Sequence, residues 1–173
     1  MAATDVQQSL VFYVPVVNQK LLSGLSSTGE TLKPYMAKHI AGRANEFPPL
    51  REGAPDEVKL AVIEIPGLPL DDIVTTLGES SRPVRAIKMD IEGHEAAALR
   101  GARRLIAERR PVLMIEGSLP DPSVRDIMSE HGYVRAARVG GQLVPWNQHS
   151  PGSDTFWYHP DTTDVLRSRG LVP

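Results

Sequence analysis

Residues 86–95 constrain the fold of this chain more than any other segment. An apolar run there ends at Asp90, and Glu92, Gly93 and Glu95 follow before a helix-forming stretch begins. This order predicts a strand, a tight turn and a helix N-terminus, with three carboxylates at the turn. In open α/β sheets, ligands bind beyond the carboxyl ends of the strands. We therefore expect a functional site at this turn.

A second apolar run, residues 110–116, repeats the pattern and ends at Glu116. Between the two runs, residues 94–109 carry apolar side chains at helical spacing, which predicts one helix. Strand, helix and strand in this order predict a parallel pair of strands joined by a right-handed crossover. We expect the first strand near 84–90, so that Asp90 and Glu116 lie side by side at one edge of the sheet.

Turn and capping residues predict the remaining elements. Gly140-Gly141 separates two strand-like runs and predicts a hairpin. The other expected elements are strands at 9–17, 57–65 and 155–158, helices from Ser27 toward Ile40, from Asp71 to Gly78, from Asp121 to Gly132 and after Pro160, and a loop at 43–56. Together they predict an α/β fold with parallel central strands and an antiparallel hairpin edge, in a single domain over residues 1–173.

The composition is that of an ordinary globular protein. Of 173 residues, 41% are hydrophobic and 23% charged, and the net charge of −2 gives no case for a nucleic-acid partner. No apolar stretch approaches the roughly 20 residues that span a bilayer, so we expect no membrane partner. The absence of cysteine excludes disulfides and thiolate metal sites. A cytoplasmic location is the expectation that follows.

The acids at the turn also have a purely structural interpretation. Carboxylates at a helix N-terminus stabilise its dipole by ~0.3–1 kcal/mol each, and Gly93 fits a plain turn. Crowded carboxylates, however, raise one another's pKa, which suits a general base. Lys88 shares a strand face with Asp90. Because a lysine on a covered parallel strand needs a partner, we expect Lys88 to pair with an acid and to orient Asp90 or Glu116.

Several segments together look like the FkbM family. They are Lys88-Met89-Asp90-Ile91-Glu92-Gly93-His94-Glu95, Leu99-Arg100-Gly101-Ala102, Arg110-Pro111-Val112-Leu113-Met114-Ile115-Glu116 and, upstream, Leu70-Asp71-Asp72-Ile73. Ala3-Thr4-Asp5 and the run from Leu10 to Pro15 resemble the region after the family's third strand. The resemblance runs over nearly the whole chain and implies an S-adenosylmethionine-dependent methyltransferase with a partial Rossmann-like fold.

The resemblance implies roles for particular residues. Asp90 and Glu116 would accept the proton of an acceptor hydroxyl or hold that hydroxyl, and Glu92 and Glu95 would shape the turn and contact substrate or cofactor. Ala2 and Ala3 would flank the adenine, with Asp90 also bordering the cofactor. The expected substrate contacts are Lys88, His94, Trp146 and Asn147, near Asp154. We expect no metal, since His94-Glu95 lacks the helical spacing of a zinc site.

The sequence departs from the family in its cofactor half. A complete domain resembles two halves, and the first carries a glycine-rich loop after its first strand and an acid after its second. Neither motif occurs in these 173 residues, which resemble the C-terminal two-thirds of such a domain. We therefore expect S-adenosylmethionine to bind only if the missing N-terminal half is supplied. The acceptor would be a hydroxyl of a small molecule or glycan, such as a sugar or natural product.

Two alternatives to an enzyme remain open. One is a non-catalytic remnant or a partner-dependent module, in which the strand ending at Asp90 has an open edge that invites self-association. The other is a binding module that uses the acidic rim for a cation or a basic ligand. Arginines at the end of the predicted helix, among them Arg109 and Arg110, fit a solvated face, with an anionic partner as the alternative.

Overall fold

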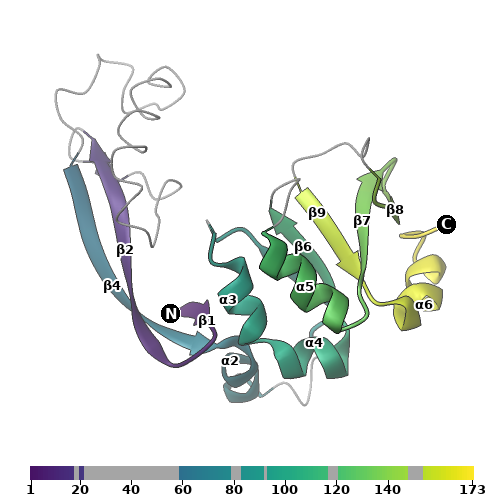
Figure 1. Ribbon diagram of the computed structural model, residues 1–173, viewed down its shortest axis with the longest axis horizontal. Helices are drawn as coiled ribbons and strands as arrows, with labels where there is room; N and C mark the ends of the chain where they lie inside the picture. Colours follow the sequence, from purple (N-terminus) through teal and green to yellow (C-terminus); the bar gives the residue numbers. More distant parts are fainter. Residues whose placement is uncertain (18–19, 22–58, 79–82, 92, 117–120, 148–153) are drawn as a thin grey trace. The chain divides into compact units, whose positions relative to one another are not determined.

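The computed structural model describes residues 1–17, 20–21, 59–78, 83–91, 93–116, 121–147 and 154–173 (Figure 1). The chain divides into two compact units. The smaller contains residues 1–2 and 8–67, and the larger contains residues 3–7 and 68–173. The predicted helix from Ser27 and the predicted loop at 43–56 lie outside the described residues. A single domain over residues 1–173 stays a prediction.

An antiparallel ribbon dominates the smaller unit. Strand β2 (Gln8–Val17) pairs with β4 (Lys59–Pro69) in a continuous ladder. The short strand β3 (Lys20–Leu21) pairs with β2. β1 (Ala2–Thr4), whose residues Ala3 and Thr4 belong to the larger unit, gives this sheet the order β1-β4-β2-β3. The strand predicted at 9–17 is confirmed. The strand predicted at 57–65 ends at Pro69 instead, because the start of β2 pairs with β4 as far as Gly67 and extends the ladder.

A five-stranded sheet organises the larger unit, with the order β5-β6-β9-β7-β8. Its strands are β5 (Ala86–Met89), β6 (Val112–Glu116), β7 (Val134–Val139), β8 (Gln142–Pro145) and β9 (Asp154–Tyr158). β5 and β6 are parallel, whereas the β6–β9, β9–β7 and β7–β8 pairs are antiparallel. The predicted α/β class, with parallel strands and an antiparallel hairpin edge, is confirmed.

Short helices connect and cover the strands of the larger unit. They are α2 (Leu70–Thr76), α3 (Glu95–Arg100), α4 (Arg103–Arg109), α5 (Pro122–Glu130), the 3₁₀ turn η6 (Pro160–Thr162) and α6 (Thr163–Ser168). At the start of α5, the Asp121 carboxylate accepts a hydrogen bond from the Ser123 amide at 2.6 Å, as predicted. In the predicted hairpin, Gly140 and Gly141 have φ of 57° and 89°, which a two-residue type I′ turn requires.

The prediction of one helix over residues 94–109 is wrong, because the chain breaks between α3 and α4 at Gly101. The Gly101 carbonyl accepts a hydrogen bond from the Asp71 amide at 2.9 Å. The Asp71 carboxylate then accepts from the amides of Arg104 and Leu105 at 2.9 and 2.8 Å. A residue distant in sequence thereby caps α4, which satisfies amides that a helix start leaves unpaired.

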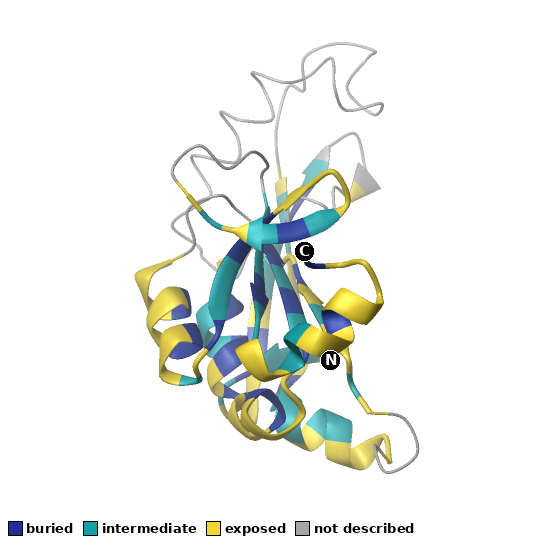
Figure 2. Cartoon of the chain, turned by 90° about the vertical axis from the view of Figure 1, so that its right-hand side faces the viewer, coloured by how far each residue is buried: buried dark blue, intermediate teal, exposed yellow. Residues whose placement is uncertain are grey.

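The sheet separates two apolar clusters on its opposite faces. On one face, residues of α3, α4 and α5 pack on Met89, Leu113, Ile115 and Trp157. On the other, Leu166 of α6 packs with residues of β7 and β8 and with Val112 and Phe156. Figure 2 shows buried residues gathered on the strands and on the inner sides of the helices. Alternation along β6 sends Leu113 and Ile115 to one side and Val112 to the other.

Candidate functional site

Lys88 and Asp90 form a close ion pair where β5 ends. The Lys88 ammonium Nζ lies 2.7 Å from Asp90 Oδ2. The hydrogen bond from Lys88 is the main reason why the pKa of Asp90 lies below its usual value; a hydrogen bond with the Glu116 carboxyl and the positive charge of Lys88 also contribute. The expectation that Lys88 pairs with an acid is confirmed by this geometry, although the Lys88 side chain is 59% exposed and not covered. The expectation that the crowded carboxylates raise the pKa of Asp90 is wrong, because the hydrogen bond from Lys88 favours the ionised form.

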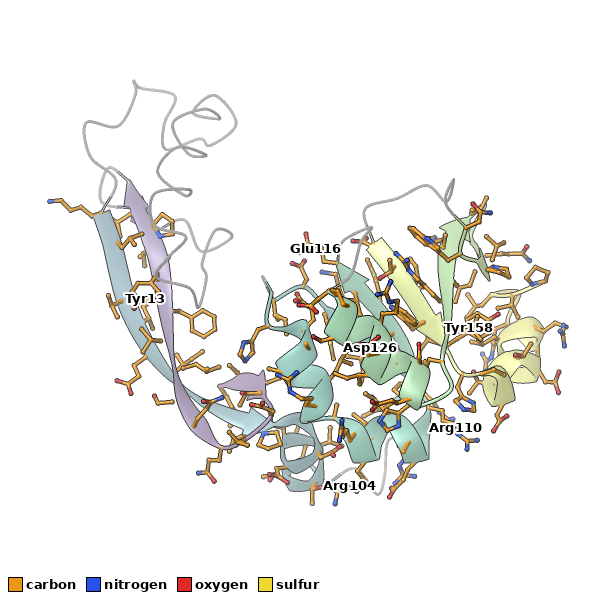
Figure 3. The ribbon with its side chains drawn as sticks, in the orientation of Figure 1. Tyr13, Arg104, Arg110, Glu116, Asp126 and Tyr158 are labelled. Atoms are coloured by element: carbon orange, nitrogen blue, oxygen red, sulfur yellow. The ribbon has the colours of Figure 1, made fainter. Side chains whose placement is uncertain are left out.

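Glu116 lies beside Asp90 at the carboxyl end of the neighbouring parallel strand, and Figure 3 shows it at that end of β6. β9 runs antiparallel to β6, so its first residue, Asp154, stands opposite Glu116. The pKa of Lys88 is raised mainly by its hydrogen bond to Asp90, and the charges of Asp90, Asp154 and Glu116 add to the effect. We call these four side chains, Lys88, Asp90, Glu116 and Asp154, the carboxylate rim.

Glu95 holds the turn between β5 and α3. It is the first residue of α3 and is buried, and its Oε1 accepts hydrogen bonds from the amides of Ile91 at 3.3 Å and Gly93 at 3.4 Å. Gly93 has φ of 88°, a conformation that side-chain-bearing residues rarely adopt. The structure thus gives Glu95 a positioning contact. Glu92 lies outside the described residues, and catalytic roles for both stay predictions.

His94 precedes α3 and faces the N-terminal segment of the larger unit. Its Nε2 lies 3.5 Å from the hydroxyl Oγ1 of Thr4, which is fully buried. Ala3, next to Thr4, packs against the apolar cluster under α3. Ala2 belongs to the smaller unit, so the proposed adenine contact through Ala2 and Ala3 stays a prediction.

Trp146 and Asn147 follow β8, at the edge of the sheet opposite β5. The Arg135 guanidinium lies 3.7 Å from the centre of the Trp146 ring, a cation–π contact, and the Trp146 amide donates to the Arg135 carbonyl at 3.1 Å. β5 and β8 are four strand steps apart, roughly 19 Å at ~4.8 Å per step. The structure therefore does not bring Trp146 next to Asp90, and a substrate role for Trp146 and Asn147 stays a prediction.

Replacing Lys88 by methionine tests the electrostatics of the carboxylate rim. We expect the pKa of Asp90 to rise toward its ordinary value, since its main stabilising hydrogen bond is lost. A depressed pKa stabilises the folded state above the unfolded-state pKa of about 3.9, and this contribution is lost as the pH falls through the folded pKa. The difference in stability between variant and wild type should therefore be present above about pH 4 and disappear as acid is added and Asp90 becomes protonated in both.

Carboxyl ¹³C NMR titration measures this shift directly. The matched control is Arg125→Met, which removes a cation from α5 and should leave the Asp90 titration unchanged. An unaltered Asp90 titration in Lys88→Met would show that the ion pair does not control this carboxylate.

The sheet defines an α/β protein whose parallel strands place acids at their carboxyl ends, the position at which such folds bind ligands. The family model for the methyltransferase FkbM domain matches residues 18–135, more than half of the chain. The chain belongs to this FkbM methyltransferase domain family.

The solved structure of methyltransferase FkbM from Methylobacillus flagellatus KT is similar to this chain. The two sequences are 27% identical, the match covers 56% of this chain and 24% of that one, and the TM-score is 0.37. This chain therefore matches about a quarter of the length of that protein. No curated protein matches the chain. No helix among the described residues is long and apolar enough to cross a membrane.

Proposed function

We propose that this chain takes part in methyl transfer from S-adenosylmethionine to a hydroxyl of a small molecule or glycan. The observation that carries the proposal is the approach of Asp90 to Glu116 across the parallel pair, with Asp154 opposite Glu116. Membership of the FkbM domain family supports methyl transfer as the class of reaction. The oxygen acceptor and the cofactor are parts of the proposal.

The side chains of the carboxylate rim are suited to binding a hydroxyl acceptor, and less suited to binding the cofactor. Carboxylates at the rim can accept hydrogen bonds from hydroxyls or amines. The glycine-rich turn that lets a backbone approach a nucleotide cofactor has no counterpart in the described strand-to-helix connections, where Gly93 is the glycine next to β5. We therefore propose that a glycine-rich segment outside these strand-to-helix connections supplies the cofactor site.

At the acceptor, the rim performs binding and proton acceptance. Asp90 or Glu116 accepts the hydrogen bond of the hydroxyl and takes its proton when the oxygen becomes alkylated. Lys88 lowers the pKa of Asp90 and orients its carboxylate, since Lys88 Nζ lies 2.7 Å from Asp90 Oδ2. Glu95 holds the turn that carries Asp90 toward α3. Alignment of the acceptor oxygen is the main contribution that these side chains make.

Radiolabel transfer tests this function. The full chain is incubated with methyl-labelled S-adenosylmethionine and host-cell extract, and label in small molecules and glycans is counted. We expect Asp90→Asn and Glu116→Gln each to reduce transfer about 100-fold, within the range for loss of a general base. The control is Asp126→Asn on α5, away from the rim (Figure 3), which should keep full transfer. Transfer that both rim variants leave unchanged would contradict the proposal.

Self-association through β5 is a further part of the proposal. Within the described sheet β5 pairs with β6 alone and so leaves one row of backbone groups open. Sedimentation velocity over a range of concentrations tests it, and a monomer at all concentrations would contradict it. A cytoplasmic location stays a prediction from the absence of cysteine.

A further inference from the structure

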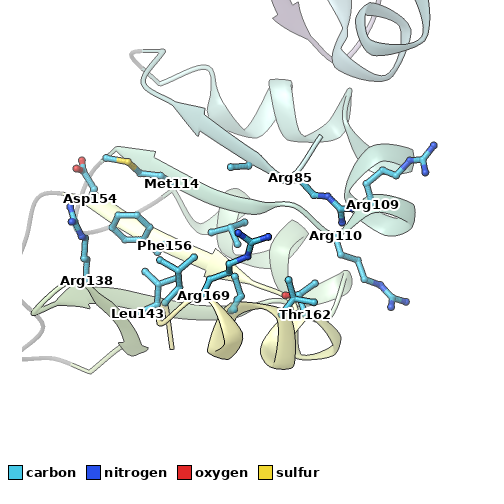
Figure 4. Close-up of a pocket in the computed structure, with 16 residues that line it drawn as sticks. Arg85, Arg109, Arg110, Met114, Arg138, Leu143, Asp154, Phe156, Thr162 and Arg169 are labelled. Atoms are coloured by element: carbon cyan, nitrogen blue, oxygen red, sulfur yellow. The ribbon is translucent and has the colours of Figure 1, made fainter. Parts of the chain in front are cut away.

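A groove of about 1070 Å³ lies on the sheet face opposite α3, α4 and α5 (Figure 4). Its floor is formed by side chains of β5, β6, β8 and β9, and its wall by α6 and the residues that follow it. The apolar floor residues are Ala86, Val112, Met114, Leu143 and Phe156. The volume is slightly above the usual range for small-molecule pockets, which is roughly 300–1,000 Å³.

The groove leaves apolar surface in contact with water. Val112, Met114 and Phe156 are half-buried, and Val165 on the wall is 60% exposed. Parallel strand pairs are usually covered on both faces. Here Leu166 of α6 packs against Val112 and Phe156, yet both of these side chains and Met114 stay only half-buried. An apolar ligand along β6 and β9 would remove this surface from water, worth roughly 25 cal/mol per Å² buried.

Cations border this apolar floor. Five arginines line the groove, Arg85, Arg109, Arg110, Arg138 and Arg169, against a single acid, Asp154. Figure 4 shows Arg85, Arg109 and Arg110 toward one end, Arg169 over the middle, and Arg138 with Asp154 at the other end. Arg110 is ion-paired with Asp161. The side chains of Arg85 and Arg169 form no ion pair within the described part of the chain.

We propose that this groove binds an elongated amphipathic anion: a molecule with an apolar body, such as an acyl chain, and a carboxylate or phosphate at one end. Arg85 and Arg169 hold the anionic group, since guanidinium groups match the geometry of carboxylate and phosphate oxygens. The apolar body lies along Val112, Met114 and Phe156. The groove shares Asp154 with the carboxylate rim, but the proposed binding does not involve Asp90 and does not depend on methyl transfer.

Calorimetric titration of the full chain with free dodecanoate, below its micelle concentration, tests the proposal. We expect saturable binding, at least ten-fold tighter than that of 1-dodecanol, which has the same chain without the charge. The double variant Arg85→Ala/Arg169→Ala should weaken dodecanoate binding at least ten-fold. Met114→Glu should weaken it as well, because it places a like charge on the floor. Circular dichroism establishes that each variant is folded.

The matched control is Arg103→Ala/Arg125→Ala, which removes the same two charges from helices on the other face. It should bind dodecanoate like the wild type. Equal binding of the acid and the alcohol, equal loss in both double variants, or no binding by the folded wild type would overturn the proposal. Binding to vesicles that contain phosphatidate, without binding to free dodecanoate, would overturn the proposal that the groove takes a free amphipathic anion. If the wild type is a dimer that does not bind dodecanoate, and the Met114→Glu variant is a monomer, the groove is an interface with a second copy of the chain and the proposal is overturned.

Discussion

Gly101→Ala should destabilise this protein by about 3 kcal/mol, at the upper end of the usual cost of overpacking. An added Cβ would lie 1.9 Å from the Thr4 carbonyl oxygen and 3.1 Å from the Pro69 Cα. Both neighbours are backbone atoms, so no side-chain rotation relieves the clash. Gly101 also lies at the break between α3 and α4, where its carbonyl oxygen accepts a hydrogen bond from the Asp71 amide. Urea unfolding followed by circular dichroism measures the change in the free energy of unfolding.

Gly78→Ala is the matched comparison for this prediction. Gly78 has φ of 72°, and an added Cβ would have nothing within 4 Å. Its substitution should therefore cost only the left-handed strain, about 1 kcal/mol. If Gly101→Ala proves no more harmful than Gly78→Ala, the close approach of the Thr4 segment to Gly101 is not a feature of the protein in solution.

Trp157→Ala should destabilise the larger unit by about 3–5 kcal/mol, as expected for truncation of a large buried aromatic side chain. Trp157 is 2% exposed on β9 and packs in the cluster under α3, α4 and α5. Its loss leaves a cavity at the centre of the sheet, where Leu113 is its partner across β6. Thermal unfolding together with urea titration measures the effect. A loss below about 1 kcal/mol would show that β9 does not occupy the central position.

Trp157→Phe separates the cavity from the polar group. The indole Nε1 is buried without a hydrogen-bond partner in the described part of the structure, and such a donor is costly. Phenylalanine removes the donor while keeping most of the apolar volume, so the net loss should be roughly 1 kcal/mol. Leu77→Ala, at a side chain that is 79% exposed, provides the surface control and should stay within about 0.5 kcal/mol of wild type.

Local chemistry explains which elements could be predicted from the sequence. Gly140-Gly141 and Asp121-Pro122-Ser123 determine a turn and a helix start through their own backbone conformations and side chains. The helix break at Gly101 could not be foreseen, because it depends on Asp71, whose carboxylate caps α4 from 33 residues upstream of Arg104. Periodicity reports which residues share a helix face; it does not report which distant side chain competes for the amides.

The candidate site could be predicted from the sequence only in part. Parallel strands end at the same edge, so the pairing of Asp90 with Glu116 followed from the order of the elements. Strand order was not available from the pattern. β9 inserts between β6 and β7, which brings Asp154 opposite Glu116 and leaves Trp146 at the far edge. Of Asp154 and Trp146, which the sequence placed near each other and near the acids, only Asp154 therefore lies beside Glu116.

The two tryptophans make this chain its own optical reporter. Trp157 is enclosed by apolar side chains, whereas Trp146 is partly exposed and has a guanidinium over its ring. Iodide in solution should quench the emission of Trp146 and be drawn to it by Arg135, while the emission of Trp157 stays protected. Detachment of the hairpin that carries Trp146 can thus be followed separately from loss of the core, in one spectrum and without a label.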